Sequence, residues 1–211
     1  MGNLLSHVRF YDFSELAGTR YETLFDSIDG WIKETAGDGA IALSQDCVNV
    51  LGGINPGAYA TLRKSPLYLN FIPDFSKKRL IRSCVYFNFK TGGLDLNYFC
   101  TGGMDEFMPG FGFHIKGDGL YAFASDGMDT TEVKVSADLT PPWDYSWILE
   151  AILFPNSHVQ FKVNEIFVTS IYAYIPTGYD TLFNLLCYSA GQGGAFAHLL
   201  QAGNGLFFQD T

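Results

Sequence analysis

An alternation of apolar and polar residues with a period of two runs through most of this chain, and it restricts the fold to one built from strands. In the segment HVQFKVNEIFVTSIYAYIP, residues 158–176, Val159, Phe161 and Val163 alternate with polar residues. Apolar residues resume after Asn-Glu at 164–165. Successive side chains of a strand point to opposite faces of a sheet, so this pattern is typical of half-buried strands. We predict a β-hairpin with its turn at 164–165 and with the three alternating apolar side chains in the core.

The same period occurs in three further segments. Residues 81–89 and 94–98 alternate on either side of KTGG, which predicts a hairpin between these two strands. Residues 111–125 contain KGDG and predict a second hairpin. The segment 145–154, which follows TPPWD, is largely apolar on both faces, as expected of a central strand that is covered twice.

Strand-like segments separated by Gly, Pro, Asn or Asp indicate a sandwich or barrel. The best helix candidate, residues 13–28, is interrupted by Gly18. No repeat at a fixed period suggests a propeller. We therefore predict one all-β domain, residues 1–211, that forms an antiparallel sandwich of two sheets.

The charge distribution argues against two classes of partner. The formal net charge is -9, and the 13 Lys and Arg residues form no cluster beyond KKR at 77–79. Nucleic acid binding requires a basic surface, so we predict no nucleic-acid partner. The first residues show no basic segment followed by an apolar one, and no apolar run is long enough to cross a bilayer. We expect no signal peptide and no membrane insertion.

The potential metal ligands are scattered. Three of the four cysteines lie in apolar, strand-like runs, where we expect them to be reduced core residues. The cysteines are Cys47, Cys84, Cys100 and Cys187. The four histidines form no pair at zinc-finger spacing. Asp126, Asp129 and Asp138 could contribute to a calcium site, but they lack a clustered pattern of alternating oxygen ligands. We predict no metal site and no cofactor.

Three segments in this order carry a family resemblance: GFGFHIKGDGLYAFASDGMDTTEV, YSWILEAILF and HVQFKVNEIFVTSIYAYIP. They resemble the concanavalin A-like lectin and glucanase superfamily, in which a long strand precedes a hairpin of the form V.F.vNG..V.t....iP. The matching residues are Val159, Phe161, Val163, Asn164, Val168 and Pro176. Glu165 stands where the family usually has Gly. The resemblance covers residues 80–210 and implies a jelly-roll sandwich.

The glucanases of that superfamily carry their carboxylates on one strand as E-x-D-x-x-E, because two of them must face the same cleft at about 5 Å. Asp105 and Glu106 are adjacent and would point to opposite faces, and Glu150 has no carboxylate two residues away. We expect these acids at surface or loop positions and predict that the protein is not an enzyme. CYSAG at 187–191 has Cys where a nucleophile elbow requires Gly, so Ser189 is expected to end a strand.

Sugar binding is a more substantial possibility, because lectins stack aromatic rings on a pyranose and bind its hydroxyls through nearby polar groups. The residues of such a set would be Trp31, Asn97, Tyr98, Trp143 and Asp144. The alternative places Trp147 and Tyr145 in the core, with Trp143 closing one end of the sandwich.

The resemblance also implies a structural role, because non-catalytic members occur as receptor-binding or decoration modules of virus and phage particles. We predict such a structural or attachment module, with a carbohydrate-binding lectin-like module as the alternative. Tyr86, Phe99, Tyr121 and Phe123 alternate against the expected core faces and would need cover from loops or from a neighbouring subunit. We therefore expect a homo-oligomer or a complex with other particle proteins. The predicted location is the virion, or otherwise the cytoplasm.

Overall fold

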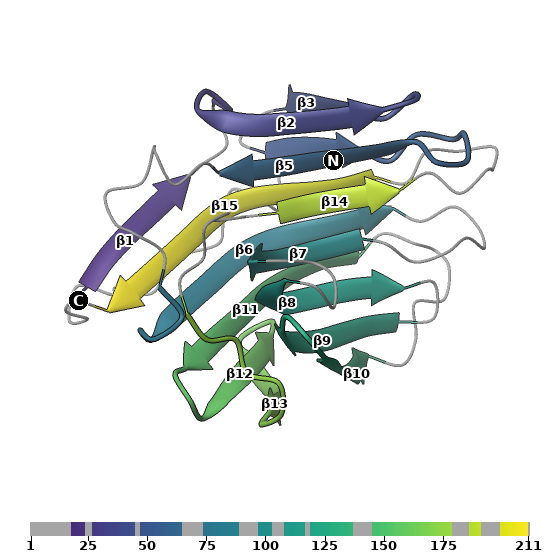
Figure 1. Ribbon diagram of the computed structural model, residues 1–211. Coiled ribbons are helices and arrows are strands. Elements are labelled where there is room, and N and C mark those ends of the chain that lie inside the picture. The colour runs from purple at the N-terminus through teal and green to yellow at the C-terminus, as the bar shows by residue number, and fades with distance from the viewer. Residues whose placement is uncertain are drawn as a thin grey trace.

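The computed structural model describes residues 18–23, 27–44, 47–64, 74–88, 97–102, 108–116, 119–136, 145–178, 186–190 and 199–210. Every regular element within these residues is a β-strand, and the strands form two antiparallel sheets that pack face to face (Figure 1). The predicted all-β sandwich is therefore confirmed. None of the described segments forms a helix long and apolar enough to span a bilayer.

In the described part of the chain, sheet 1 has eight strands and sheet 2 has seven. The order in sheet 1 is β13 (Ile166–Ile171), β12 (His158–Val163), β11 (Tyr145–Phe154), β6 (Arg79–Asn88), β15 (Leu199–Asp210), β4 (Cys47–Leu51) and β3 (Ala40–Ser44), while β1 (Gly18–Thr23) also pairs with β15. The order in sheet 2 is β10 (Thr130–Ser136), β9 (Gly119–Asp126), β8 (Pro109–Lys116), β7 (Asn97–Gly102), β14 (Leu186–Ala190), β5 (Tyr59–Lys64) and β2 (Trp31–Ala36).

The hairpin of β12 and β13 has the predicted position and orientation. Val159 and Phe161 are fully buried, and Val163 packs against the same core. The two turn residues have positive φ values, 51° for Asn164 and 70° for Glu165. Positive φ at both central positions defines a type I′ turn, which matches the twist of the two strands. The turn thus keeps its geometry although Glu occupies the position that favours Gly.

The hairpin predicted within residues 111–125 is also confirmed, because β8 and β9 pair along their whole length. The hairpin predicted across KTGG is wrong. β6 lies between β11 and β15 in sheet 1, whereas β7 lies between β8 and β14 in sheet 2. The alternation correctly predicts two strands that each have one apolar face. The two strands do not pair, however, because their apolar faces point into the core from opposite sheets. KTGG itself lies outside the described residues.

The core lies between the two sheets and is lined by the inner faces of their central strands. β11 contributes Trp147, Leu149, Ala151 and Leu153, and its flanking strands are β12 and β6, as expected of a central strand. The rings of Phe113 in sheet 2 and Phe161 in sheet 1 meet edge to face with a centroid distance of 5.4 Å. This contact joins the two layers near the β12–β13 hairpin.

The outer faces carry three of the four aromatic residues predicted there. Tyr86, Tyr121 and Phe123 alternate with core residues of β6 and β9, although Phe123 is buried. Phe99 is an exception, because it faces the core opposite Phe113. The prediction assigned Leu94, Leu96 and Tyr98 to the core face of their strand, which placed Phe99 on the other face.

Cys47, Cys84 and Cys100 are buried and reduced, which confirms the prediction for these three cysteines. Burial raises the pKa of the Cys84 thiol to about 11, because the low-dielectric surroundings disfavour the thiolate. Cys84 is therefore protonated at neutral pH and acts as a small apolar side chain.

Candidate ligand-binding surface

The structure does not bring Trp31 together with Asn97 and Tyr98, three of the five residues predicted to bind a sugar. Trp31 belongs to the core and is only 6% exposed, with the Lys64 Nζ 5.2 Å from its ring centroid. Its ring is therefore not an exposed stacking platform. Asn97 and Tyr98 begin β7, which is separated from β2 by β14 and β5, or about 14 Å at the usual strand spacing. Trp143 and Asp144 lie outside the described residues, so their role stays a prediction.

Asp126, which was considered as a metal ligand, is engaged in a turn. Asp126 Oδ1 accepts hydrogen bonds from the backbone N–H groups of Met128 and Asp129 at 2.8 and 3.0 Å, which closes the β9–β10 turn. Asp105, Glu106 and Asp138 lie outside the described residues. Within the described segments, no three His, Cys, Asp or Glu side chains are grouped so that they could hold a metal ion. Ser189 is the next-to-last residue of β14, as predicted.

A stack of three rings lies at one end of the outer face of sheet 1. Phe154 and His158 are cross-strand partners at the ends of β11 and β12, and their rings stack at 4.6 Å with an interplanar angle of 13°. Tyr172, directly after β13, stacks on His158 at 5.2 Å and 28°. We name Phe154, His158 and Tyr172 the aromatic row. Their neighbours Leu153, Val159 and Ile171 point into the core, so the row points outward.

The β11–β12 turn brings the first two rings of the row together. The Ser157 N–H donates to the Phe154 carbonyl at 3.1 Å, and Asn156 adopts a positive φ of 54°, a conformation that Asn tolerates well. Ser157 Oγ lies 2.9 Å from His158 Nδ1 and so fixes the orientation of the imidazole ring. The tight turn therefore makes Phe154 and His158 neighbours on one face.

Tyr172 is 72% exposed although one face of its ring lies against His158. The accessible surface must therefore be the opposite ring face and its edge. Tyr174 is 42% exposed and has a positive φ of 53°, a conformation that is uncommon for a bulky residue. The following residues fix this segment, because Pro176 is buried and the Gly178 carbonyl accepts a hydrogen bond from the Phe75 N–H at 2.8 Å. Two exposed tyrosines are thus held on an anchored segment.

Polar groups lie beside the aromatic row. Lys78, directly before β6, places its Nζ 5.1 Å from the Phe154 ring centroid. In the adjacent row of the same face, Gln160 is paired in register with Ser170, and both are half-buried. An exposed aromatic ring beside amide, hydroxyl and ammonium groups is an arrangement that can bind a sugar.

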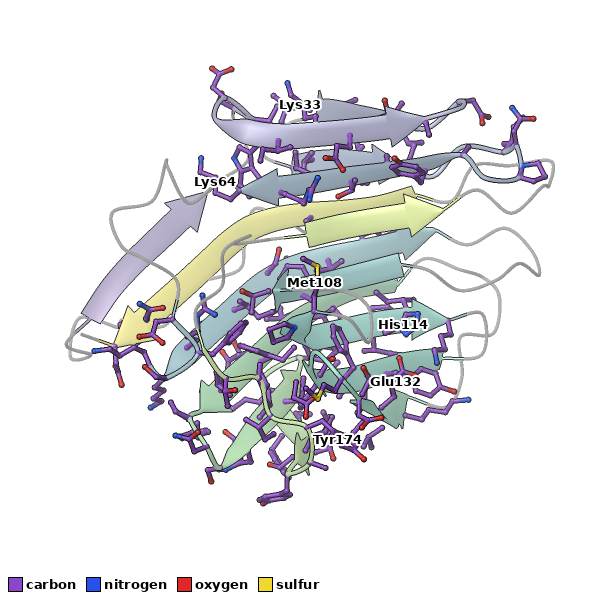
Figure 2. All side chains as sticks on the ribbon, viewed as in Figure 1. Lys33, Lys64, Met108, His114, Glu132 and Tyr174 are labelled. Atoms are coloured by element: carbon purple, nitrogen blue, oxygen red, sulfur yellow. The ribbon has the colours of Figure 1, made fainter. Side chains whose placement is uncertain are left out.

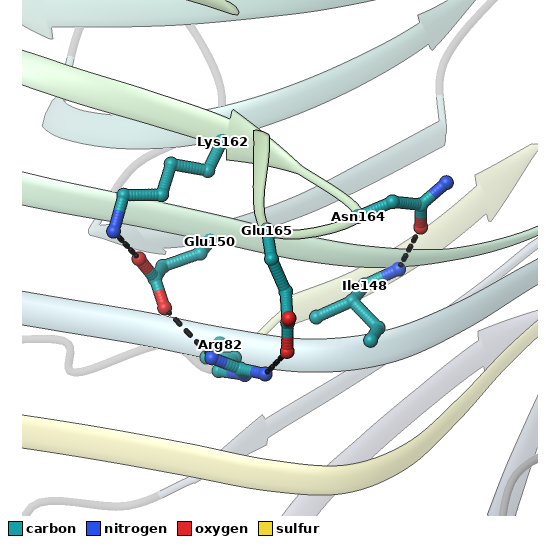
Figure 3. A network of polar contacts seen from close by, with 6 residues as sticks. All are labelled: Arg82, Ile148, Glu150, Lys162, Asn164 and Glu165. Carbon is teal, nitrogen blue, oxygen red and sulfur yellow. Dashed lines mark hydrogen bonds and ion pairs between the residues drawn. The ribbon is translucent and has the colours of Figure 1, made fainter. Parts of the chain in front are cut away.

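The opposite end of the β12–β13 hairpin carries a buried ionic network (Figure 3). Arg82 donates to Glu150 Oε2 at 3.1 Å and to Glu165 Oε1 at 3.0 Å, and Lys162 Nζ lies 2.8 Å from Glu150 Oε1. Asn164 exchanges two hydrogen bonds with the backbone of Ile148, at 2.8 and 2.9 Å. The turn is therefore tied to both β11 and β6. The expectation that Glu150 is a surface or loop residue is wrong, because its side chain is buried in the middle of β11.

A second polar cluster occupies the outer face of sheet 2. His114 on β8 and Glu132 on β10 lie near each other in Figure 2, and His114 Nδ1 is 2.5 Å from Glu132 Oε1. Lys116 pairs with the other oxygen of Glu132. Burial tends to raise the pKa of Glu132, but the hydrogen bonds from His114 and Lys116 outweigh it and the pKa is lowered. Lys116 and Lys134 both lie over the Tyr121 ring, with Nζ-to-centroid distances of 4.6 and 5.7 Å.

No protein-family model matches this sequence, and none of the curated proteins compared with it does. The fold is similar to that of solved toxin structures, among them the binding domains of toxins. A structure of botulinum neurotoxin type C covers 84% of this chain and 43% of its own, with a TM-score of 0.56 and 8% identity. The binding domain of botulinum neurotoxin DC, in complex with rat synaptotagmin II, gives the same coverage and TM-score at 9% identity. The binding domain of Paraclostridial Mosquitocidal Protein 1 gives 0.55 at 10% identity, with 85% of this chain and 44% of its own covered.

The chain thus spans less than half of the length of these structures. At such low identity the likeness concerns the fold and assigns no residue a role.

Sequence reasoning missed the aromatic row, although two signals were present. Pro155-Asn156-Ser157 is a turn sequence that makes Phe154 and His158 cross-strand neighbours, and Tyr172 and Tyr174 stand just beyond the apolar end of a predicted strand.

Proposed function

We propose that this chain is a concanavalin A-like binding module without catalytic activity and that it recognises a glycan through Tyr172. The observation that carries the proposal is the rigid presentation of this exposed ring. A tyrosine on the surface normally loses side-chain freedom when a ligand binds, whereas Tyr172 is already stacked on His158 at 5.2 Å. A pyranose can then stack on the outward ring face, and Gln160, Ser170 and Lys78 are the candidate hydrogen-bond donors and acceptors.

Two further observations support a binding role over catalysis. Both oxygens of Glu150 are engaged, one by Arg82 and one by Lys162, so this carboxylate is committed to the fold. Two of the similar structures are described as binding domains, and cell entry of botulinum neurotoxin type C is described as dependent on interaction with two ganglioside molecules. These descriptions concern those proteins, and they favour a glycan as the first ligand class to test.

The test is a glycan array probed with the native chain, Tyr172→Ala and Phe167→Ala. Phe167 is a matched control, because it is 55% exposed on the same hairpin but lies outside the aromatic row. We expect the native chain and Phe167→Ala to bind the same glycans and Tyr172→Ala to lose them. An array without any bound glycan, or equal binding by all three proteins, would contradict the proposal.

A second candidate function is a multi-copy structural or attachment module of a viral particle. Its supporting observation is the edge strand β13, which exposes Ile166 by 69% and Phe167 by 55%. Such apolar exposure on the strand that ends the sheet among the described residues favours contact with another subunit. A stable interface should bury more than about 1,000 Å² and survive dilution to micromolar concentration. Light scattering should then detect an oligomer that Phe167→Ala weakens and Tyr172→Ala leaves intact, whereas a monomer at all concentrations would exclude this candidate.

A further inference from the structure

We propose that the aromatic row binds an acidic oligosaccharide, with one sugar ring stacked on Tyr172 and a carboxylate further along the saccharide bound by Lys78. The ligand class rests on the glycan function proposed above, to which the position of Lys78 adds a charge and a minimum length. Lys78 lies at the end of the aromatic row opposite to Tyr172, and its ammonium group faces the row.

The basic segment Lys77-Lys78-Arg79 lies beside the aromatic row. Arg79 is fully buried, and its guanidinium lies 4.4 Å from the ring centroid of Phe75 in the core. Successive residues of a strand point to opposite faces, so Lys78 points outward, as Phe154 does. The Lys78 Nζ lies 5.1 Å from the Phe154 ring centroid, within the range of cation–π attraction. Strand alternation thus places one ammonium group of this segment at the row.

The order of the strands sets the length of ligand that can use both ends of the row. β11 lies between β6 and β12, so Lys78 and His158 are on opposite sides of Phe154. Tyr172, directly after β13, is three strand spacings from Lys78, or about 14 Å at the usual strand spacing. A single sugar ring on the outward face of Tyr172 cannot reach Lys78, whereas an oligosaccharide can.

Hydrogen bonds fix the backbone around Lys78. Its carbonyl accepts a hydrogen bond from the Asp210 N–H at 3.0 Å, and the Lys77 N–H donates to the Asp74 carbonyl at 3.2 Å. The Asp74 N–H donates to Gln209 Oε1 at 2.9 Å, which ties this turn to β15. The ammonium group of Lys78 therefore extends from a fixed point. Its contact with the row further reduces the side-chain entropy that is lost when a ligand binds.

The contacts of Lys78 favour a carboxylate as the ligand group. Asp74 and Asp210 belong to the segments that flank Lys78, but neither forms an ion pair with it among the described residues. Asp74 Oδ1 instead accepts a hydrogen bond from the Ser76 N–H at 2.8 Å. The ammonium group lies over the Phe154 ring, on the side away from β15. A charge-assisted hydrogen bond to a carboxylate is stronger than this ring contact or a bond to a neutral hydroxyl.

The experiment measures binding of the full chain to an array of oligosaccharides that contain uronic or sialic acids, at about 50 mM and about 500 mM NaCl. The methyl ester of each oligosaccharide and the free monosaccharide acids are printed beside it. We expect the acids to bind at least about threefold more tightly than their methyl esters at low salt, and the monosaccharides to bind most weakly. Equal binding of acids and esters, or of monosaccharides and oligosaccharides, would overturn the proposal.

Three variants test whether Lys78 is the source of the preference for the acid. Lys78→Met keeps the apolar stem without the charge and should bind acids and esters equally, whereas Lys78→Arg should keep the preference. Lys77→Met is the matched control, because it makes the same change in net charge at the adjacent, half-buried residue, and it should also keep the preference. Each preference is a ratio within one protein, so a change in stability does not affect it. Equal losses of the preference in Lys77→Met and Lys78→Met, or none in Lys78→Met, would overturn the role of Lys78.

Tyr172→Ala separates this inference from the proposed function. If Tyr172→Ala loses the bound glycans while the native chain does not distinguish acids from esters, the row binds a glycan and only the assignment of Lys78 is wrong. If Tyr172→Ala binds every glycan like the native chain, stacking on Tyr172 is wrong and the proposed function fails with it.

Discussion

The two outer faces of the sandwich use the same kinds of charged residue in opposite surroundings. On sheet 1, the side chains of Arg82 and Glu150 are 2% and 6% exposed. On sheet 2, those of Lys116 and Glu132 are both 27% exposed. A buried pair stabilises the fold only while both partners are present, because a single buried charge is costly. A pair that reaches solvent contributes little to stability and can exchange partners with a ligand. This difference assigns a structural role to the sheet 1 network.

Truncation of a side chain on the apolar inner face should cause the largest loss of stability, against which the charged outer faces can be compared. Phe161→Ala should lower the free energy of unfolding by about 3 to 5 kcal/mol, because the ring is fully buried and meets Phe113 across the core. Denaturant titration measures this change, with Phe161→Leu as a milder control. A loss of less than about 1 kcal/mol would show that the side chain is not part of the core.

Arg82→Met should cost nearly as much as a core truncation, about 3 kcal/mol or more, since it leaves Glu150 buried without its main partner. The combined variant Arg82→Met/Glu150→Leu should recover a large part of that loss, because it removes the unpaired charge. If Arg82→Met alone is nearly neutral in urea titration, the network is not buried as described and the contrast between the faces fails.

Glu165 sharpens the comparison because it combines backbone strain with an ionic contact. Its φ of 70° favours Gly, whereas its carboxylate accepts a hydrogen bond from Arg82 at 3.0 Å. Glu165→Ala keeps the strain and loses the contact, so it should be about 1 kcal/mol less stable than Glu165→Gly. The native chain should exceed both in thermal and chemical unfolding. An alanine variant as stable as the native chain would show that the contact with Arg82 contributes no net stability.

The smallest effect is expected on sheet 2. Glu132→Gln should change the free energy of unfolding by less than about 1 kcal/mol at neutral pH. The folded-state pKa of Glu132 lies below its ordinary value of 4.5, so its contribution is present above that value and is lost as the pH falls through the folded-state pKa. The difference between the native chain and Glu132→Gln should therefore shrink on acidification. A difference that does not change between about pH 6 and pH 3 would contradict this assignment.

The sequence predicted which segments form strands better than it predicted which strands pair with one another. Alternation in β11 and β12 depends on neighbouring residues only, and it placed Phe161 in the core and Glu165 in a turn. The partner of a strand depends on distant segments, so the pattern could not show that β6 and β7 belong to different sheets. The Arg82–Glu150 pair joins residues that are 68 positions apart. Without this pairing, Glu150 has the appearance of a solvent-exposed acid.

The same limit applies to the candidate site. Trp31 was selected because tryptophan often stacks on sugars, but the edge strand β2 directs it into the core beneath Lys64. Residue type alone does not determine which aromatic rings reach solvent. The aromatic row depends on the β11–β12 register, which places Phe154 opposite His158. That register could be predicted from the turn, whereas the exposure of Tyr172 required the structure.

The central claim is that stacking on His158 prepares Tyr172 for a glycan, and calorimetric titration of the strongest array ligand tests it most directly. The proteins are the native chain, Tyr172→Ala, His158→Ala and the double variant. We expect at least about a tenfold loss for Tyr172→Ala, a smaller loss for His158→Ala, and no further loss in the double variant, because His158 acts through Tyr172. Unchanged affinity in Tyr172→Ala, or losses that simply add in the double variant, would contradict the account.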